Sequence, residues 1–174
     1  MAAKLWWLNP ASEADWDALY AEQMPRIYNF FRFRVGHGAV AEDLTARTFE
    51  RAWIARRRYR RNLGAFSTWL LSIARNVAVD HWRSHREHVP LEDAAQIAGG
   101  ERPDELAERR SDEARLGALL ATLPQREREL IALKYGAGLT NRAIARQTGL
   151  SESNVGTILH RTVQGLRARW MEGA

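Results

Sequence analysis

Apolar residues recur at helical spacing through the first half of this 174-residue chain. The pattern predicts three helices, over residues 12–35, 40–57 and from about 65 to beyond 80, separated at Gly36, Gly38 and the turn at 62–64. Pro25 should bend or divide the first of them. The positions expected to face inward are Trp16, Leu19, Tyr20, Ile27, Phe30 and Phe31, then Leu44, Phe49, Ala52 and Trp53, then Phe66, Trp69, Leu70, Ile73, Ala74 and Val77.

The second half has shorter helical segments. Residues 114–123 and a helix from Pro124 to Tyr135 precede a stretch punctuated as two helices joined by a tight turn. Thr140 can cap the first of these helices, Gly149 supplies the turn, and Ser151 can cap the second. This arrangement is typical of a helix-turn-helix, whose second helix enters a DNA major groove.

Residues 89–113 are rich in Pro, Gly, Glu and Asp and predict a flexible linker. No strand-like alternation or internal repeat is found. The expected fold is therefore all-α, with two small helical domains over 12–88 and 114–174, this acidic linker between them, and an N-terminal extension over 1–11. The extension holds Trp6 and Trp7, whose role stays open.

Charge follows the same division. Residues 1–90 carry 14 Lys and Arg against 9 Asp and Glu, residues 91–114 carry 3 against 8, and residues 115–174 carry 9 against 4. Two basic blocks on an acidic tether are typical of two modules that bind nucleic acid, although the acidic stretch could equally be a solvated linker and nothing more.

Composition excludes several classes of protein. The absence of cysteine removes disulfides, thiol nucleophiles and thiolate zinc sites. The spacing of His81, His85 and His88 raises the question of a metal, but no acidic triad accompanies them, so we expect neither metal nor cofactor. No catalytic motif occurs, which predicts that the chain is not an enzyme. No apolar run could span a membrane and the first residues do not resemble a signal peptide, so a cytoplasmic site is expected.

Three stretches then resemble one family, the extracytoplasmic-function (ECF) sigma factors of the bacterial sigma-70 family. Residues 41–53 (AEDLTARTFERAW) resemble its region 2.2, and residues 66–80 (FSTWLLSIARNVAVD) resemble regions 2.3 and 2.4. Residues 123–129 (LPQRERE), running into the helix-turn-helix, resemble region 4. The resemblance implies a dissociable RNA polymerase subunit that recognises minus 35 and minus 10 promoter elements, assists promoter melting and directs transcription initiation.

The resemblance assigns minus 10 recognition to the arginine-rich loop and the third helix. Arginines bind phosphates, and an aromatic ring or amide can receive an unstacked base. Trp69 shares the inner face and is expected to be core, Tyr59 could stack on a base or pack, and Asn76 could bond to backbone instead. The candidates for minus 10 DNA are Arg58, Tyr59, Arg60, Arg61, Arg75 and Asn76.

The second helix of the helix-turn-helix would read minus 35 DNA, with Ser153, Asn154, Thr157, His160 and Arg161 opposite its apolar face. Gly156 and Ile158 stand where the family often has a basic residue. Glycine is poor inside a helix, so either binding in isolation is weak or this glycine admits a close approach of the backbone to DNA.

The implied partners are core RNA polymerase, promoter DNA and an anti-sigma factor. Residues 42–53 would bind the clamp helices of the largest subunit, and the flap of the second-largest subunit is the other expected contact. The candidate residues are Asp43, Thr48, Glu50 and Arg51, although Glu42 and Asp43 could simply complement the helix dipole. The alternative to a sigma factor is a helix-turn-helix regulator that binds duplex DNA alone, which would leave the match of the first block unexplained.

Overall fold

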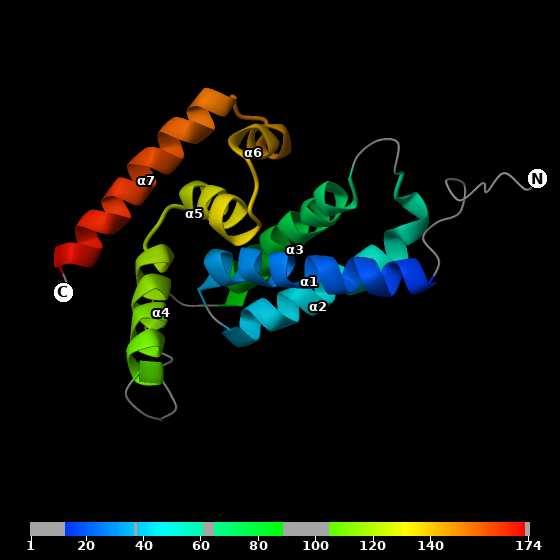
Figure 1. Ribbon diagram of the computed structural model, residues 1–174, viewed down its shortest axis with the longest axis horizontal. Helices are drawn as coiled ribbons and strands as arrows, with labels where there is room; N and C mark the ends of the chain where they lie inside the picture. The colour runs from blue at the N-terminus through cyan, green and yellow to red at the C-terminus, as the bar shows by residue number, and fades with distance from the viewer. Residues whose placement is uncertain (1–12, 37, 61–64, 89–104, 173–174) are drawn as a thin grey trace, which may run out of the picture.

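A computed structural model describes residues 13–36, 38–60, 65–88 and 105–172, and these contain helices but no strand (Figure 1). In chain order the elements are α1 (Glu13–Val35), α2 (Gly38–Ala55), the 3-10 turn η1 (Arg56–Arg58), α3 (Phe66–His88), α4 (Glu105–Ala121), α5 (Gln125–Ile131), the π turn η2 (Ala132–Gly136), α6 (Asn141–Thr148) and α7 (Glu152–Glu172). The all-α prediction is confirmed.

The first three helices lie close to their predicted positions. Pro25 does not divide α1, which is helical through to Val35. Of the inward positions, Ile27, Phe30 and Phe31 are almost fully buried, whereas Tyr20 is 43% exposed. The Tyr20 ring nevertheless contacts Phe49 of α2, with 4.4 Å between ring centroids. It therefore covers the edge of the core instead of entering it.

One expectation about the linker is wrong. Helix α4 begins at Glu105, inside the stretch 89–113 that composition assigned to a flexible connector. The first residues of α4 include Glu, Leu, Ala and Arg, which are all strong helix formers. Charged composition indicates solvation but does not exclude a helix, so this prediction confused a polar segment with an unstructured one.

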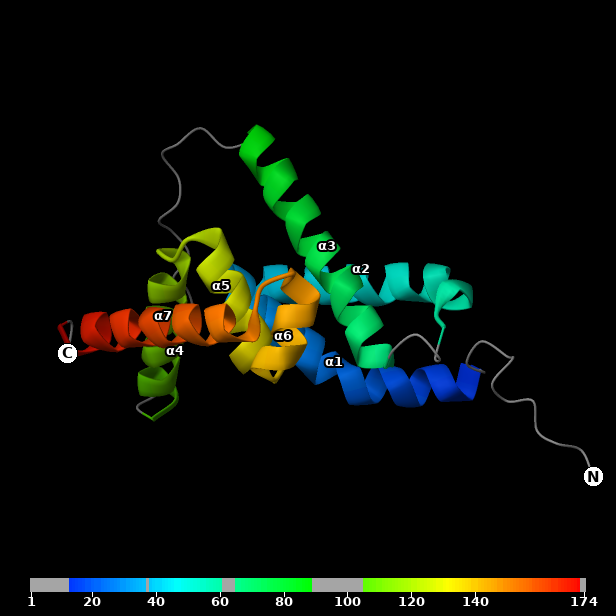
Figure 2. The same ribbon diagram turned by 90° about the horizontal axis from the view of Figure 1, so that it is seen from above.

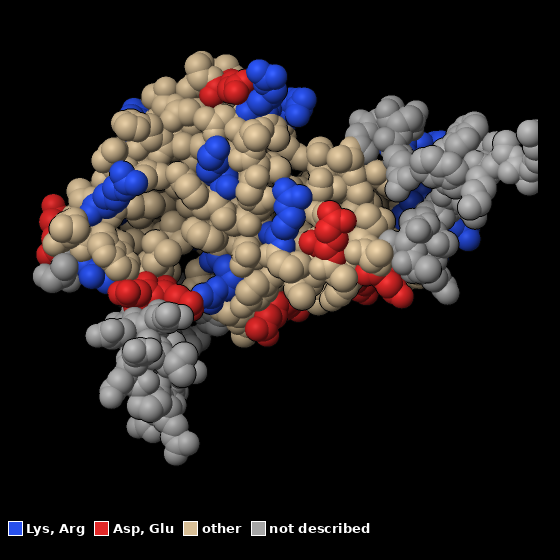
Figure 3. Space-filling view, in the orientation of Figure 1, with Lys and Arg blue, Asp and Glu red and all other residues tan. Residues whose placement is uncertain are grey.

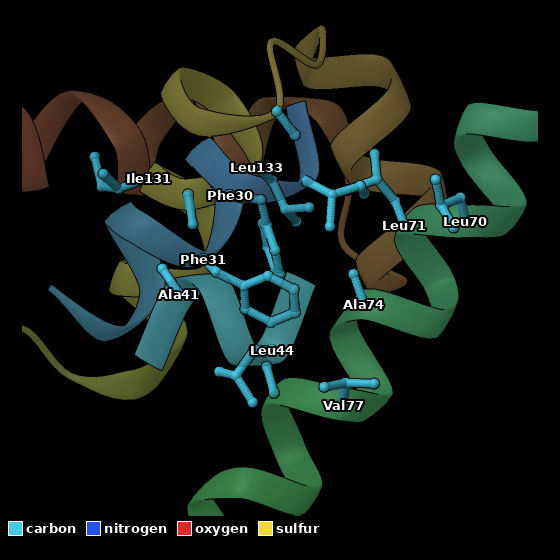
Figure 4. Close-up of a cluster of buried hydrophobic side chains, with 14 of the residues drawn as sticks. Phe30, Phe31, Ala41, Leu44, Leu70, Leu71, Ala74, Val77, Ile131 and Leu133 are labelled. Carbon is cyan, nitrogen blue, oxygen red and sulfur yellow. The ribbon is translucent and has the colours of Figure 1, made fainter. Parts of the chain in front are cut away.

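The two helical blocks share a single hydrophobic core. Buried side chains from α1, α2 and α3 lie in one cluster with Ile131 and Leu133, which belong to α5 and η2 (Figure 4). Phe30, Phe31, Leu44 and Leu133 are all completely buried. The sequence suggested two domains that each bury their own apolar faces, whereas in this conformation part of each face is buried against the other block.

Helix α1 provides most of this junction, because η2 packs along it. Figures 1 and 2 both show α5 beside α1, with α7 on the outer side of the molecule. The Arg26 guanidinium of α1 donates two hydrogen bonds to the carbonyl oxygen of Ala137, at 3.1 and 2.9 Å. Arg34 of α1 donates to the carbonyl of Gln125 at 3.2 Å. Polar contacts thus flank the shared core.

Candidate nucleic-acid interface

The helix-turn-helix is held by the local signals that its sequence contains. The Thr140 hydroxyl accepts a hydrogen bond from the backbone N–H of Ala143 at 3.2 Å and caps α6. Gly149 ends α6 at φ 74°, in the left-handed region that favours glycine. The Ser151 hydroxyl accepts from the N–H of Asn154 at 3.2 Å and caps α7. All three predicted roles are confirmed.

Helix α7 presents two faces of opposite character. Val155 and Leu159 are buried against the core. The five residues named for minus 35 DNA are all exposed, namely Ser153, Asn154, Thr157, His160 and Arg161. The Thr157 hydroxyl donates to the carbonyl oxygen of Ser153 at 3.0 Å, which leaves its methyl group directed away from that bond. The outward face is thus polar and accessible, as a helix that enters a DNA groove requires.

Gly156 lies at the border of this exposed face. It is partly buried, and a Cβ built on it would lie 3.5 Å from Nδ2 of Asn141 in α6, an ordinary van der Waals distance. The nearest atom to this Cβ position is therefore in α6, and a close approach of the Gly156 backbone to DNA stays a prediction. Ile158 is also partly buried and packs against the core. A basic side chain at either position would have to leave the α6–α7 junction.

Replacing Gly156 with alanine should stabilise the chain by about 0.5–1 kcal/mol, because the methyl group has room and alanine favours a helix. Thermal unfolding measures the effect. Gly149→Ala is the contrasting variant and should lose roughly 1–2 kcal/mol, since φ 74° strains any residue with a Cβ. A lower melting temperature for Gly156→Ala would show that the α6–α7 junction is tighter than the built Cβ indicates.

The arginine-rich loop leads into an aromatic cluster at the start of α3. Arg58 and Arg60 are exposed, while Arg61 lies outside the described residues. The ring of Tyr59 is half-buried and contacts Phe66 and Trp69, with centroids 5.4 and 5.2 Å apart. Tyr59 therefore packs against these rings in this structure, and its stacking on a DNA base stays a prediction. Trp69 is only half-buried, so it is a peripheral part of the core and not a central one.

Arg75 and Asn76 stand next to each other on α3 but differ in their surroundings. Asn76 is exposed. Arg75 is held by the second block: its Nε donates to Oε1 of Glu129 at 2.6 Å, and its Nη1 donates to the carbonyl oxygen of Gln147. The Gln147 side chain in turn donates to the carbonyl of Thr68, at 3.0 Å. The helix-turn-helix thus touches the helix assigned to minus 10 DNA.

Two buried arginines lie beside this contact and were missed at the sequence level. Burial lowers the pKa of Arg34; the negative charge of Glu129 raises this pKa, and the positive charges of Arg128 and Arg75 lower it further. Burial also lowers the pKa of Arg128. Guanidinium groups remain charged even so. Both lie over the Trp82 ring, at 6.0 and 5.3 Å from its centroid. No local pattern identifies them, because their surroundings come from α1, α3 and α5.

The exposed face of α2 carries most of the residues assigned to the polymerase. Asp43 forms an ion pair with Arg47 at 2.9 Å, and Arg51 forms one with Asp80 of α3 at 2.6 Å. Thr48 is the exception, because it is fully buried and its hydroxyl donates to the carbonyl of Leu44 at 2.7 Å. Thr48 therefore cannot be a surface contact in this structure. Asp43, Glu50 and Arg51 remain candidates.

Basic and acidic side chains are unevenly distributed over the described surface. On the face shown in Figure 3, basic side chains are scattered over the part formed by α5, α6 and α7, and acidic ones lie along the lower edge and also at the top and left of the view. Within the described part of the chain, no three His, Asp or Glu side chains are placed to hold a metal ion. The side chains of His85 and His88 lie outside the described set. None of the described helices combines the length and apolar character of a membrane span.

Comparisons with known proteins agree with this geometry. The sequence matches the families described as Sigma-70 region 2, over residues 19–88, and Sigma-70, region 4, over residues 113–165. It is 32% identical to the ECF RNA polymerase sigma factor BldN of Streptomyces coelicolor over 90% of this chain, although it spans only 61% of that protein. It is 30% identical to the ECF sigma factor SigF of Caulobacter vibrioides, covering 80% of this chain and 76% of SigF.

The fold is also that of a solved structure. The structure of CnrH in complex with the cytosolic domain of CnrY superposes with a TM-score of 0.71 at 21% identity, covering 94% of this chain and 92% of CnrH. Both regions occur here in order, which a helix-turn-helix regulator acting alone would not explain. The chain belongs to the ECF group of RNA polymerase sigma factors in the sigma-70 family.

Proposed function

We propose that this sigma factor divides its three contacts among α2, α3 and α7. The exposed face of α2, with Asp43, Glu50 and Arg51, binds the clamp helices of core polymerase. The loop after η1 and the exposed side of α3 capture minus 10 DNA through Arg58, Tyr59, Arg60, Arg61, Arg75 and Asn76. The outward face of α7 binds minus 35 duplex through Ser153, Asn154, Thr157, His160 and Arg161.

The exposed polar face of α7 is the observation that carries this assignment. Its five candidate residues are exposed while Val155 and Leu159 on the other side are buried. In a helix-turn-helix the second helix reads base edges from its N-terminal part, and Asn and Arg pair with adenine and guanine. Because Ser151 caps α7 immediately before these residues, the N-terminal turns that would enter the groove are well defined.

Reconstitution with core polymerase tests the function. Transcript starts mapped after overexpression supply the promoter, and the purified chain is assayed with and without core on duplex and on a premelted bubble template. We expect specific transcription only from the reconstituted holoenzyme, on both templates. Specific duplex binding by the chain alone, with no effect on transcription by core, would instead identify a simple regulator.

Arg161→Ala should weaken binding of holoenzyme to minus 35 duplex about 5- to 100-fold, because a guanine or phosphate contact is lost. Fluorescence anisotropy over a range of salt concentrations measures the affinity for the duplex and how steeply that affinity falls with salt. Arg167→Ala is the matched control, since it removes the same charge from another exposed position on α7. Equal losses for the two variants would indicate a general charge effect and no contact at Arg161.

Three further assignments follow from this role. The sigma factor RpoE from Bartonella quintana, whose fold matches this chain with a TM-score of 0.67, was solved in complex with the anti-sigma factor NepR. We extend that kind of association to this chain and propose an anti-sigma partner. Action on core polymerase and chromosomal promoters also places the chain in the cytoplasm. We also propose that region 4, the second helical block of this chain, binds the flap of the second-largest subunit of core polymerase.

A further inference from the structure

One arginine of the arginine-rich loop is bound to the protein itself. Arg57, Arg58 and Arg60 are exposed, whereas Arg56 is half-buried. Its guanidinium carbon lies 3.8 Å from the centroid of the Trp53 ring, and its Nη1 donates to the carbonyl oxygen of Trp53 at 2.7 Å. A planar guanidinium stacks on a ring and donates at the same time, which an ammonium group cannot do in the same geometry. Arg56 is therefore engaged by α2 and differs from its neighbours in the run.

The backbone of Arg56 holds the next part of the same turn. Its carbonyl oxygen accepts a hydrogen bond from the N–H of Tyr59 at 3.2 Å, which closes η1. Tyr59 then leaves the turn in an extended conformation, at φ −65° and ψ 127°. Arg56 is thus fixed twice, by its guanidinium to the end of α2 and by its carbonyl to the residue where the chain changes direction. Loss of the guanidinium would remove a side-chain tie between η1 and α2.

A row of aromatic rings extends this anchoring to α1 and α3. The Trp53 ring contacts Trp16 of α1 edge-to-face, with centroids 5.3 Å apart, and Trp16 contacts Phe66 of α3 at 5.7 Å. Phe66 and Trp69 of α3 both contact the ring of Tyr59. Aromatic pairs favour particular mutual orientations, so each ring restricts the next. The orientation of Tyr59 therefore depends on a network whose outer end is Trp53, the ring that the arginine covers.

We propose that Arg56 is a positioning residue for minus 10 capture, and that it acts through Trp53 and Tyr59 without touching DNA. A loop that receives an unstacked base binds that base better if its geometry is fixed before the base arrives. Arg58 and Arg60 are exposed and supply the phosphate contacts. The arginine run is thereby divided into one member that shapes the loop and others that bind DNA. The inference rests on the proposed role of this loop in minus 10 binding.

Binding of reconstituted holoenzyme to a fork template with a single-stranded minus 10 segment, over a range of salt concentrations, tests this role. Arg56→Gln should weaken binding about 5- to 10-fold, part of the value of one stacked base, and leave the salt dependence unchanged. Arg58→Gln should instead make the salt dependence shallower, because a phosphate contact is lost. Arg57→Gln is the matched control, since it removes the same charge from an exposed position of η1, and should cost less affinity than Arg56→Gln. A shallower salt dependence for Arg56→Gln would show that Arg56 binds a phosphate and would overturn the inference.

Two further variants test the route by which Arg56 acts. Arg56→Lys keeps the positive charge but loses the planar group, so it should remain weaker than the parent on the fork template. Full rescue by lysine would show that charge alone suffices and would overturn the stacking role. If Arg56 acts through Tyr59, Arg56→Gln should cause no additional loss of affinity in a Tyr59→Ala background. Additive losses in the double variant would overturn that route.

The same holoenzymes distinguish failure of this inference from failure of the proposed function. Affinity for minus 35 duplex should be unchanged by Arg56→Gln, and equal losses on both templates would show a general loss of structure and no positioning role. If circular dichroism shows that Arg56→Gln is unfolded, Arg56→Lys decides. If Tyr59→Ala weakens binding to the fork template while neither Arg56 variant does, the inference alone fails. If Arg58→Gln and Tyr59→Ala both bind the fork template as the parent does, the proposed minus 10 role of the loop fails.

Discussion

Phe30→Ala should destabilise the chain by about 3–5 kcal/mol, the largest effect expected of any single substitution discussed here. Phe30 is completely buried, contacts Phe31 edge-to-face at 5.2 Å between centroids, and lies in the cluster that also holds Leu133. Because this cluster joins the two blocks, the chain should unfold in one cooperative transition, and the substitution should lower the denaturant concentration at its midpoint. Denaturant unfolding followed by circular dichroism and tryptophan fluorescence measures it.

Ile54→Ala is the control, since Ile54 is 72% exposed and should change stability by less than about 0.5 kcal/mol. Two separate transitions in the parent protein, with only one moved by Phe30→Ala, would contradict a shared core. That result would mean that the blocks unfold independently despite their contact. Coincident transitions by both probes would support the continuous packing seen in Figure 4.

Asn76→Ala should reduce transcription from a duplex promoter by about 10- to 100-fold, because contacts to an unstacked base are worth roughly 1–3 kcal/mol. Asn76 is exposed in the middle of α3, and alanine is the better helix former, so the fold should be retained. The measurement is multiple-turnover transcription by reconstituted holoenzyme, together with binding to a fork template that presents a single-stranded minus 10 segment.

Asn29→Ala removes the same side chain from an exposed position on α1, away from the proposed DNA contacts, and should leave transcription intact. Binding of Asn76→Ala holoenzyme to minus 35 duplex alone should also be unchanged, which distinguishes loss of capture from loss of assembly. Normal activity on the fork template would mean that Asn76 only bonds locally, the structural role that the sequence left open.

The prediction of Thr48 as a surface contact failed for a reason already visible in the sequence. Leu44 and Ala52 lie one helical turn before and after Thr48, and both are buried. Residues spaced by four share a helix face, so Thr48 lies on the buried face, although it was not among the predicted inward positions and the family resemblance placed it on the polymerase surface. Asp43 and Glu50 satisfied both criteria and are exposed. Where the two kinds of argument disagree, the helical period decided correctly.

The helix-turn-helix was predictable from sequence because each of its signals acts within four residues. Thr140 and Ser151 cap the helix that follows each of them, and Gly149 ends the one before it, whatever the rest of the fold does. The division of α7 into a buried and an exposed face follows from its period alone. The sequence itself therefore determined the all-α class and the first three helices. It also determined which residues lie on the exposed face of α7 proposed to bind minus 35 DNA.

Only the tertiary structure decided how the two blocks meet. Arg75 and Glu129 are 54 residues apart in the chain, and Arg26 and Ala137 are 111 apart. No local preference brings such pairs together, since their contact depends on the packing of η2 along α1 and on the space left by Gly136. Composition suggested two modules on a tether, whereas the structure shows that the two blocks share a core and that η2 closely approaches α1 at Gly136.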